Sequence, residues 1–290
     1  MGAEEVIPTE ESTLEPAIAA ENPVDAALGT AAPPSRFPVG AVLLPLIVAV
    51  VLLVVWQIAV VVTDNQILPT PLAVVEGTQE LIVKGVLHRY IISSLFRVIW
   101  SFLLAVAVGV PFGLLLGWST RASQAFNPIL QILRPISPIA WIPLSILWFG
   151  MSERQSMFLI FLASVFPITV AAMAAVQNIQ LNYLRAARNF GLTRLQLFLH
   201  VILPATLPQI LTGLRIALGI AWLVVVAAEM VVVDPHVGGL GFLINDSRSA
   251  GRYDYVVAGM VIIGVIGFIL DLLIRLVERL DDIRWGYVAK

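Results

Sequence analysis

Three charged side chains interrupt long apolar stretches of this sequence of 290 residues: Arg134, Arg215 and Glu229. A charge at membrane depth costs about 2.5 to 3.5 kcal/mol on insertion scales. Each of the three therefore needs a salt-bridge partner on another helix or a position near a membrane face. Arg215 and Glu229 are 14 residues apart, about 21 Å along one helix, so they do not pair with each other.

No catalytic motif is visible in the chain. There is no Gly-Lys pair and hence no P-loop for ATP, and no Gly-x-Ser-x-Gly nucleophile elbow. The absence of cysteine excludes disulfides and thiolate metal sites. The three histidines, His88, His200 and His236, are too far apart in sequence to suggest a metal cluster. We expect no catalysis, and no metal or cofactor, in this chain.

Three glycines, Gly238, Gly239 and Gly241, follow the stretch that contains Glu229. A dinucleotide-binding loop would need a third glycine at position 244, which is Ile244, and a surrounding strand-helix unit. The sequence therefore predicts a flexible loop here.

Composition assigns most of the chain to a membrane. Hydrophobic residues make up 59% of it and charged residues only 12%, against about 25% charged residues in soluble domains. Residues 1–36 differ, because they hold seven acidic residues and one basic residue, Arg36. This tail lacks the pattern of a signal peptide and is predicted to be disordered. It is either a plain solvated extension or a docking segment.

Residues 37–290 contain six apolar stretches long enough to cross a bilayer. We expect an all-α membrane domain with spans at about 39–63, 91–120, 124–149, 155–178, 204–233 and 255–275. The second has Gly109, Gly113 and Gly117 on one face, suited to close helix packing. The third is broken by prolines. Lys and Arg are modestly more frequent on one side, which places both termini in the cytoplasm.

The longest predicted cytoplasmic loop is residues 182–203. Its first part forms a short helix that ends at Gly191, a residue suited to the left-handed end of a helix. Thr193 then begins a second helix, with Gln196 completing a capping box. Pro204 and Pro208 mark the beginning of the fifth span. Ala186 and Ala187 have no core to fill in such a loop, so we expect this compact knob to dock on another protein.

The spacing of the knob's residues resembles the EAA loop of ABC importer permeases. The match consists of Arg185-Ala186-Ala187, then Gly191, then Val201-Ile202-Leu203-Pro204. Arg185 stands where the motif has Glu, and Val201 where it has Ile. Further stretches, at 67–75, 134–150, 213–230 and 238–244, resemble permeases that import taurine, aliphatic sulfonates, nitrate or bicarbonate.

This resemblance implies a type I ABC importer permease in a bacterial inner membrane. Such a permease is expected to pair with a second copy of itself, as a homodimer, and with two cytoplasmic ATPase subunits that hold ATP and Mg²⁺. An extracytoplasmic binding protein delivers a small anionic substrate. The coupling loop comprises Arg185, Ala186, Ala187, Gly191, Thr193, Leu203 and Pro204. Lipid surrounds the spans, and no nucleic acid is expected as a partner.

The resemblance adds a second interpretation for the charges within the spans. Arg134, Arg215 and Glu229 either form structural salt bridges or lie on the route of the anion, where Ser137 and Ser145 could donate hydrogen bonds. These serines could equally satisfy backbone groups at a helix break. Two other functions stay open: an ion-coupled secondary transporter and a membrane scaffold that transports nothing.

Overall fold

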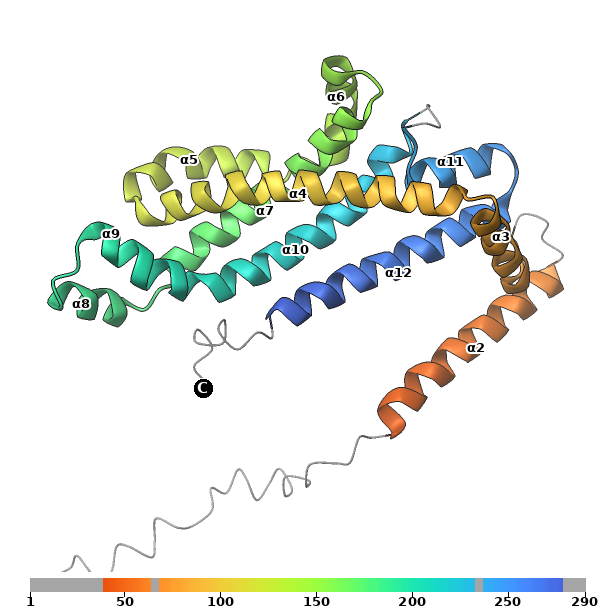
Figure 1. The fold of residues 1–290 in the computed structure, drawn as a ribbon, viewed down its shortest axis with the longest axis horizontal. Coiled ribbons are helices and arrows are strands. Elements are labelled where there is room, and N and C mark those ends of the chain that lie inside the picture. The colour runs from red at the N-terminus through yellow and green to blue at the C-terminus, as the bar shows by residue number, and fades with distance from the viewer. Residues whose placement is uncertain (1–38, 64–67, 233–236, 279–290) are drawn as a thin grey trace, which may run out of the picture. The chain divides into compact units, whose positions relative to one another are not determined.

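The computed structural model describes residues 39–63, 68–232 and 237–278, and all the regular structure in these ranges is helical. The predicted acidic tail, residues 1–36, lies outside the described residues. The helices are α2 (Val39–Thr63), α3 (Pro71–Val83), α4 (Val86–Trp118), α5 (Thr120–Leu133), η2 (Pro138–Trp141), α6 (Ile142–Phe149), α7 (Glu153–Gln177), α8 (Leu181–Asn189), α9 (Arg194–Leu197), η3 (Phe198–Ile202), α10 (Leu203–Glu229), α11 (Leu240–Ser249) and α12 (Tyr253–Glu278) (Figure 1).

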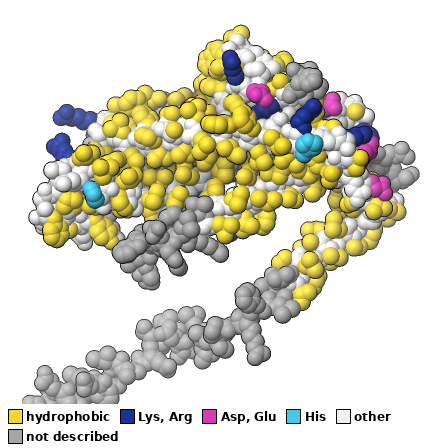
Figure 2. Space-filling view, in the orientation of Figure 1, with side chains coloured by type: hydrophobic (Ala, Val, Ile, Leu, Met, Phe, Trp, Pro, Cys, Tyr) yellow, Lys and Arg dark blue, Asp and Glu magenta, His cyan; other side chains and the backbone are white. Residues whose placement is uncertain are grey.

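Five of the described helical segments are long and apolar enough to cross a bilayer: Leu43–Thr63, Val86–Trp118, Glu153–Gln177, Arg194–Glu229 and Tyr253–Leu276. A sixth span results if the bent pair α5 and α6 is counted as one. The surface over the middle of α4 and its neighbours is apolar, whereas charged side chains gather near α3 and α11 at one end and near α5 and α9 at the other (Figure 2). This distribution fits a hydrocarbon layer between two aqueous phases.

The helix α2 is apolar along its whole length and contains Pro45. Most of its described side chains are exposed, including Leu44 and Val62. Such a surface suits contact with lipid rather than with water.

The helices α4 and α7 pack in parallel along the centre of the remaining fold. Gly109 lies against Ile168, and Gly117 lies against Val176. The residue numbers increase in the same direction along both helices, so the helices are parallel. Between them, a Cβ on Gly113 would overlap the carbonyl oxygen of Thr169. The predicted face of small residues is therefore confirmed, and it allows the two backbones to approach closely.

The helix α10 runs antiparallel to both α7 and α12. Against α7, Gly213 meets Ala171 at one end, and Val224 clusters with Leu159 and Ala163 at the other. Against α12, the indole Nε1 of Trp222 donates a hydrogen bond to the carbonyl of Ile263 over 3.0 Å. These contacts place α10 between α7 and α12. We call the end of this helix bundle that carries α8 and α9 the α8 end, and the end that carries α3 and α11 the α11 end.

The segment between α5 and α7 is broken as the sequence predicts. The axes of Thr120–Leu133 and Pro138–Phe149 differ by 84°. Pro135 and Pro138 lie at the bend, where a proline cannot donate the backbone hydrogen bond that a continuous helix needs. Consequently α6 turns away from α4 and α5 (Figure 1).

The close approach of α4 and α7 predicts that a Gly→Ala substitution destabilises the protein at their contact but not at an open position. Gly113→Ala should lower the free energy of unfolding by about 1 to 3 kcal/mol, because the added methyl group overlaps backbone. The control is Gly264→Ala in α12, where a Cβ meets nothing within 4 Å. That variant should be neutral or slightly stabilising. Denaturant unfolding in detergent measures both, and equal effects would contradict this packing.

Candidate functional site

The coupling loop forms the two helices that the sequence predicts. The helix α8 ends at Asn189, and Phe190 is its C-cap. Gly191 follows with a φ of +73°, and its N–H donates to the carbonyl of Arg188 over 2.9 Å. Thr193 caps α9 through a complete capping box with Gln196. The backbone N–H of Thr193 donates to Oε1 of Gln196 over 2.9 Å. The positive φ at Gly191 is a conformation that L side chains rarely adopt.

The second helix does not stop before the fifth span. A π-helical turn, η3, joins α9 to α10, so that one apolar segment runs from Arg194 to Glu229. The α-helix α10 itself begins at Leu203, one residue before the predicted beginning of the fifth span at Pro204. Pro204 lies in the first turn of α10, where the missing N–H of a proline is tolerated, and the wide turn η3 precedes it.

The side chains of the coupling loop divide into a buried and an exposed set. Ala187 is buried and clusters with Leu197, Ile202 and Ile210, so the expectation that it has no core to fill is wrong. Arg185 and Ala186 are exposed. Phe190 is 84% exposed, so its ring adds apolar surface to the exposed set.

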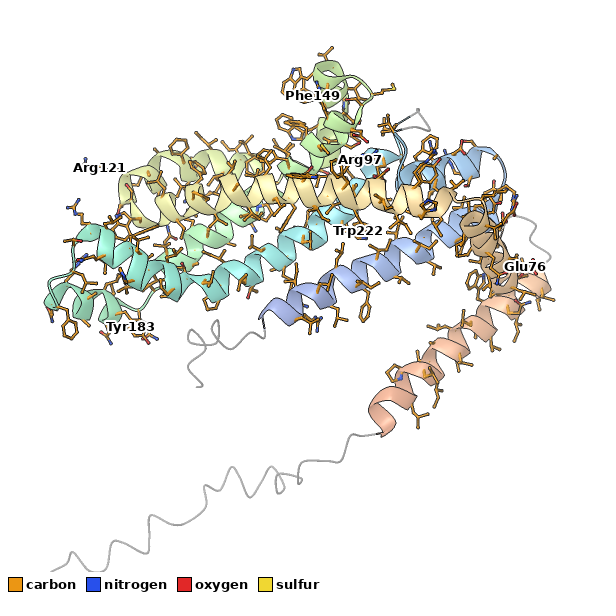
Figure 3. All side chains as sticks on the ribbon, in the orientation of Figure 1. Glu76, Arg97, Arg121, Phe149, Tyr183 and Trp222 are labelled. Atoms are coloured by element: carbon orange, nitrogen blue, oxygen red, sulfur yellow. The ribbon has the colours of Figure 1, made fainter. Side chains whose placement is uncertain are left out.

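A cavity of about 1020 Å³ opens beside the coupling loop. Its walls come from the ends of α7 and α10 together with α8 and η3, and Tyr183 on α8 is labelled in Figure 3. Uncharged polar side chains line it, among them Asn178, Gln180, Gln209 and Thr212, together with His200.

At the α11 end, Glu229 forms a fully buried ion pair that connects three helices. Its Oε1 lies 2.6 Å from NH1 of Arg97 on α4, and both side chains are 0% exposed. The hydroxyl of Ser94 donates to the same carboxylate over 2.8 Å. The backbone N–H of Gly241, at the beginning of α11, donates to Oε2 over 3.0 Å. The carboxylate is thus satisfied on both oxygens, as a buried charge requires.

The glycine loop before α11 is packed around this carboxylate. A Cβ on Gly239 would overlap the Glu229 carboxylate, and one on Gly241 would overlap the carbonyl oxygen of Val226. The neighbouring Leu240 is fully buried, and its N–H donates to Ser94 Oγ over 2.9 Å. The prediction of a flexible loop is therefore wrong for these residues, because the glycines allow close contact with a buried charge.

Arg97 also connects to a fourth element, α7. Its NH2 lies 3.2 Å from Oε1 of Glu153 in the first turn of α7, and the same nitrogen donates to the carbonyl of Val237. Figure 3 labels Arg97 on α4. The sequence alone does not place Arg97 among the predicted site residues. Its signal is the spacing Ser94, Arg97, Ser101, which places three polar side chains on one face of an otherwise apolar helix.

Arg215 forms an ion pair of a different kind. Its Nε and NH2 bind the two carboxylate oxygens of Asp271 on α12, over 2.7 and 3.2 Å. Arg275 contacts the same carboxylate over 2.8 Å. Both Arg215 and Asp271 are partly exposed. Arg215 and Glu229 consequently have separate partners, each on another span, as the salt-bridge interpretation requires.

The remaining predicted pathway residues lie around the bend between α5 and α7. Arg134 and Ser137 are exposed at the bend itself. Ser145 is buried in α6, and its hydroxyl donates to the carbonyl of Ile142 over 2.7 Å. This contact is the backbone-satisfying role of a serine near a helix break.

A charged cluster fastens α3 to the turn before α12. Lys84 and Arg252 both contact Glu80, over 2.6 and 2.8 Å, and together they lower the pKa of Glu80 to about 2. Glu80 in turn raises the pKa of Lys84. Because the folded pKa of Glu80 lies below its ordinary value of 4.5, this attachment is fully present above about pH 4.5 and is lost as the pH falls towards 2.

No group of three His, Cys, Asp or Glu side chains that could hold a metal occurs among residues 39–63, 68–232 and 237–278. The polar groups described above therefore do not form a metal centre within this part of the chain.

Known proteins share both the sequence and the fold of this chain. A family described as "Binding-protein-dependent transport system inner membrane component" matches residues 109–280. The taurine transport system permease protein TauC of Escherichia coli is 36% identical over 80% of this chain and 85% of its own length. The nitrate import permease protein NrtB of Leptolyngbya laminosa is 36% identical over 77% of this chain and 82% of its own.

A bicarbonate transport system permease protein, CmpB of Synechococcus elongatus, is 32% identical over 82% of this chain and 88% of its own length. Among solved structures, the inward-facing MetNI methionine ABC transporter matches with a TM-score of 0.59 and 18% identity. The match covers 67% of this chain and 95% of the MetNI chain. At that identity the match supports the fold alone.

The buried ion pair predicts a specific pattern of stability changes. Arg97→Met should lower the free energy of unfolding by about 3 to 5 kcal/mol, because it leaves Glu229 charged and buried. The double variant Arg97→Met with Glu229→Met should recover part of that loss. As a control, Arg215→Met affects a partly exposed pair and should cost about 1 kcal/mol or less. Thermal unfolding in detergent measures all three, and a double variant no more stable than Arg97→Met would contradict this reading.

Proposed function

Since the chain belongs to the family of binding-protein-dependent transport system inner membrane components, we propose that it is the permease subunit of an ATP-driven importer of a small anion. The observation that carries the proposal is the similarity to taurine, nitrate and bicarbonate permeases over most of their length. The chain is an inner membrane protein that supplies the path for the substrate, and it performs no catalysis of its own.

ATP hydrolysis belongs to separate subunits. Two cytoplasmic ATPases bind the exposed side of the coupling loop, where Phe190 and Leu195 present apolar surface beside Arg185 and Ala186. Closing of the ATPases on ATP moves the loop and the spans attached to it, and the path then opens to the other side of the membrane. The continuous helix from Arg194 to Glu229 supports this role, because it extends from the coupling loop to the α11 end without a flexible joint.

The proposed topology has six spans, with α5 and α6 together forming the third. Both termini and the α8 end then face the cytoplasm, and the α11 end faces the binding protein. A modest excess of Lys and Arg on the cytoplasmic side supports this orientation.

A second copy of the chain completes the path, as a homodimer. The cavity at the α8 end is the cytoplasmic mouth of the path in this proposal. Its uncharged amides and hydroxyls can hydrogen-bond an anion weakly enough to release it. Arg134 and Ser137 remain proposed contacts along the path because they are exposed at the helix break.

The experiment that tests the function is a substrate panel. The complex of this permease with its ATPases, reconstituted in lipid, is presented with binding protein loaded with taurine, an alkylsulfonate, nitrate or bicarbonate. ATP turnover should rise several-fold with one of these anions. No rise with any of them would contradict an anion importer and favour a scaffold.

The coupling loop yields a sharper prediction. Gly191→Val forces a β-branched residue to adopt a φ of +73°, a strain of about 1 to 3 kcal/mol that the loop can relieve by changing shape. The number of anions imported per ATP hydrolysed should then fall by about tenfold, while the spans stay folded.

Gly251→Val is the matched control, because Gly251 has a φ of +72° and equally open surroundings but lies in the turn between α11 and α12. It should leave the ratio of anions to ATP unchanged, even if the rate falls. An unchanged ratio in Gly191→Val would argue against docking through this loop.

A further inference from the structure

Four buried polar atoms at the α11 end have no hydrogen-bond partner among the described residues. They are Arg97 Nε, Ser101 Oγ, Gln155 Nε2 and Ser156 Oγ. Their side chains belong to residues that are at most 3% exposed, and each atom carries a hydrogen that it can donate. A buried donor without an acceptor is destabilising, so a group of four points to an acceptor that binds there.

These donors lie at similar heights along the axes of the parallel helices α4 and α7. The contact between Arg97 and Glu153 fixes the register of the two parallel helices. Ser101 follows Arg97 by one helical turn, and Gln155 and Ser156 follow Glu153 by two and three residues. The N-terminus of α7 is at the same level, and the dipole of the helix adds partial positive charge there. We call this set of residues the α4–α7 seam.

The two carboxylates that bind Arg97 are held very differently. Glu229 is fully buried and accepts hydrogen bonds from Ser94 and Gly241 as well as from Arg97. Glu153 is 47% exposed and lies 3.2 Å from Arg97. Glu153 can therefore turn into solvent at little cost, whereas Glu229 cannot leave without breaking the contacts of the glycine loop.

We propose that the α4–α7 seam is a binding subsite for a small singly charged oxyanion, which replaces the Glu153 carboxylate on Arg97 and accepts hydrogen bonds from Gln155 and Ser156. This inference rests on the proposed function, since it places the transported anion at the α11 end of the path. A sulfonate, nitrate or bicarbonate group presents oxygens that can accept the bonds that the Glu153 carboxylate accepts, with the same single charge.

Charge balance sets the specificity of this subsite. Arg97 and Glu229 neutralise each other, so exchanging one monoanion for another leaves the net charge of the seam unchanged. A dianion such as sulfate would add a second negative charge close to the buried carboxylate of Glu229, where like charges repel strongly. The seam therefore favours monoanions over dianions.

The test uses the complete permease–ATPase complex in lipid nanodiscs without binding protein. Sodium nitrate is titrated at constant ionic strength against sodium sulfate, and the midpoint of thermal unfolding reports binding to the folded state. Because sulfate stabilises folded proteins without a specific site, the reported quantity is the nitrate-minus-sulfate difference in midpoint, which should be larger in the parent than in Ser156→Ala. Glu153→Gln removes the competing charge and should tighten the apparent nitrate affinity about tenfold. Ser156→Ala should weaken it.

Two controls separate binding from folding. Glu76→Gln removes an exposed carboxylate on α3 and should leave the nitrate titration as in the parent protein. Ser156→Ala removes a hydroxyl with no partner, so without nitrate it should not lower the midpoint. Loss of nitrate binding with unchanged stability is a result that a merely structural serine would not give.

The proposal is overturned if the nitrate-minus-sulfate difference in midpoint is the same in the parent, Glu153→Gln and Ser156→Ala. Stimulation of ATP turnover by loaded binding protein, measured on the same preparation, reports the proposed function separately. Stimulation without nitrate binding would reject the subsite and keep the importer. Nitrate binding without stimulation would keep the subsite and count against the importer.

Discussion

The ion pair between Arg97 and Glu229 determines how the α11 end of this protein is built. Two opposite charges removed from water are stable only when every remaining hydrogen-bonding group of the carboxylate finds a partner. Ser94 and the backbone of Gly241 supply those partners, and the requirement brings α4, α10 and the beginning of α11 together. The glycine loop follows from the same constraint, since a Cβ on Gly239 would occupy the place of the carboxylate.

The rest of the helical frame divides into a rigid and an adjustable part. From Gly109 to Gly117, α4 and α7 are in backbone contact, so this stretch has little room to move. Beyond it, at the α11 end, the contact is polar and includes the half-exposed Glu153. At the α8 end, the coupling loop is continuous with α10 through η3. One helical segment of 36 residues, about 50 Å long, therefore connects the coupling loop to the buried ion pair.

The sequence predicts the features that depend on local chemistry. Apolar length gives the long helices, the glycine spacing gives the α4–α7 contact, and Gly191 with the Thr193 capping box gives the shape of the coupling loop. The features that depend on distant partners were not predictable. Arg97 directly precedes the uncharged stretch 98–120, and only the fold brings it to Glu229, 132 residues later. For the same reason, the sequence predicts a flexible glycine loop, although this loop packs around a charge. The sequence also predicts an exposed Ala187, although α10 covers this residue.

The central claim is that this chain provides a path that opens and closes in step with ATP binding and hydrolysis in a partner. The most direct measurement is uptake of a labelled small anion into vesicles that contain the permease, its ATPases and the loaded binding protein. Uptake should require ATP and should stop when the ATPases carry a substitution that abolishes hydrolysis. Uptake that continues with those inactive ATPases, driven by an ion gradient, would contradict the account and identify a secondary transporter instead.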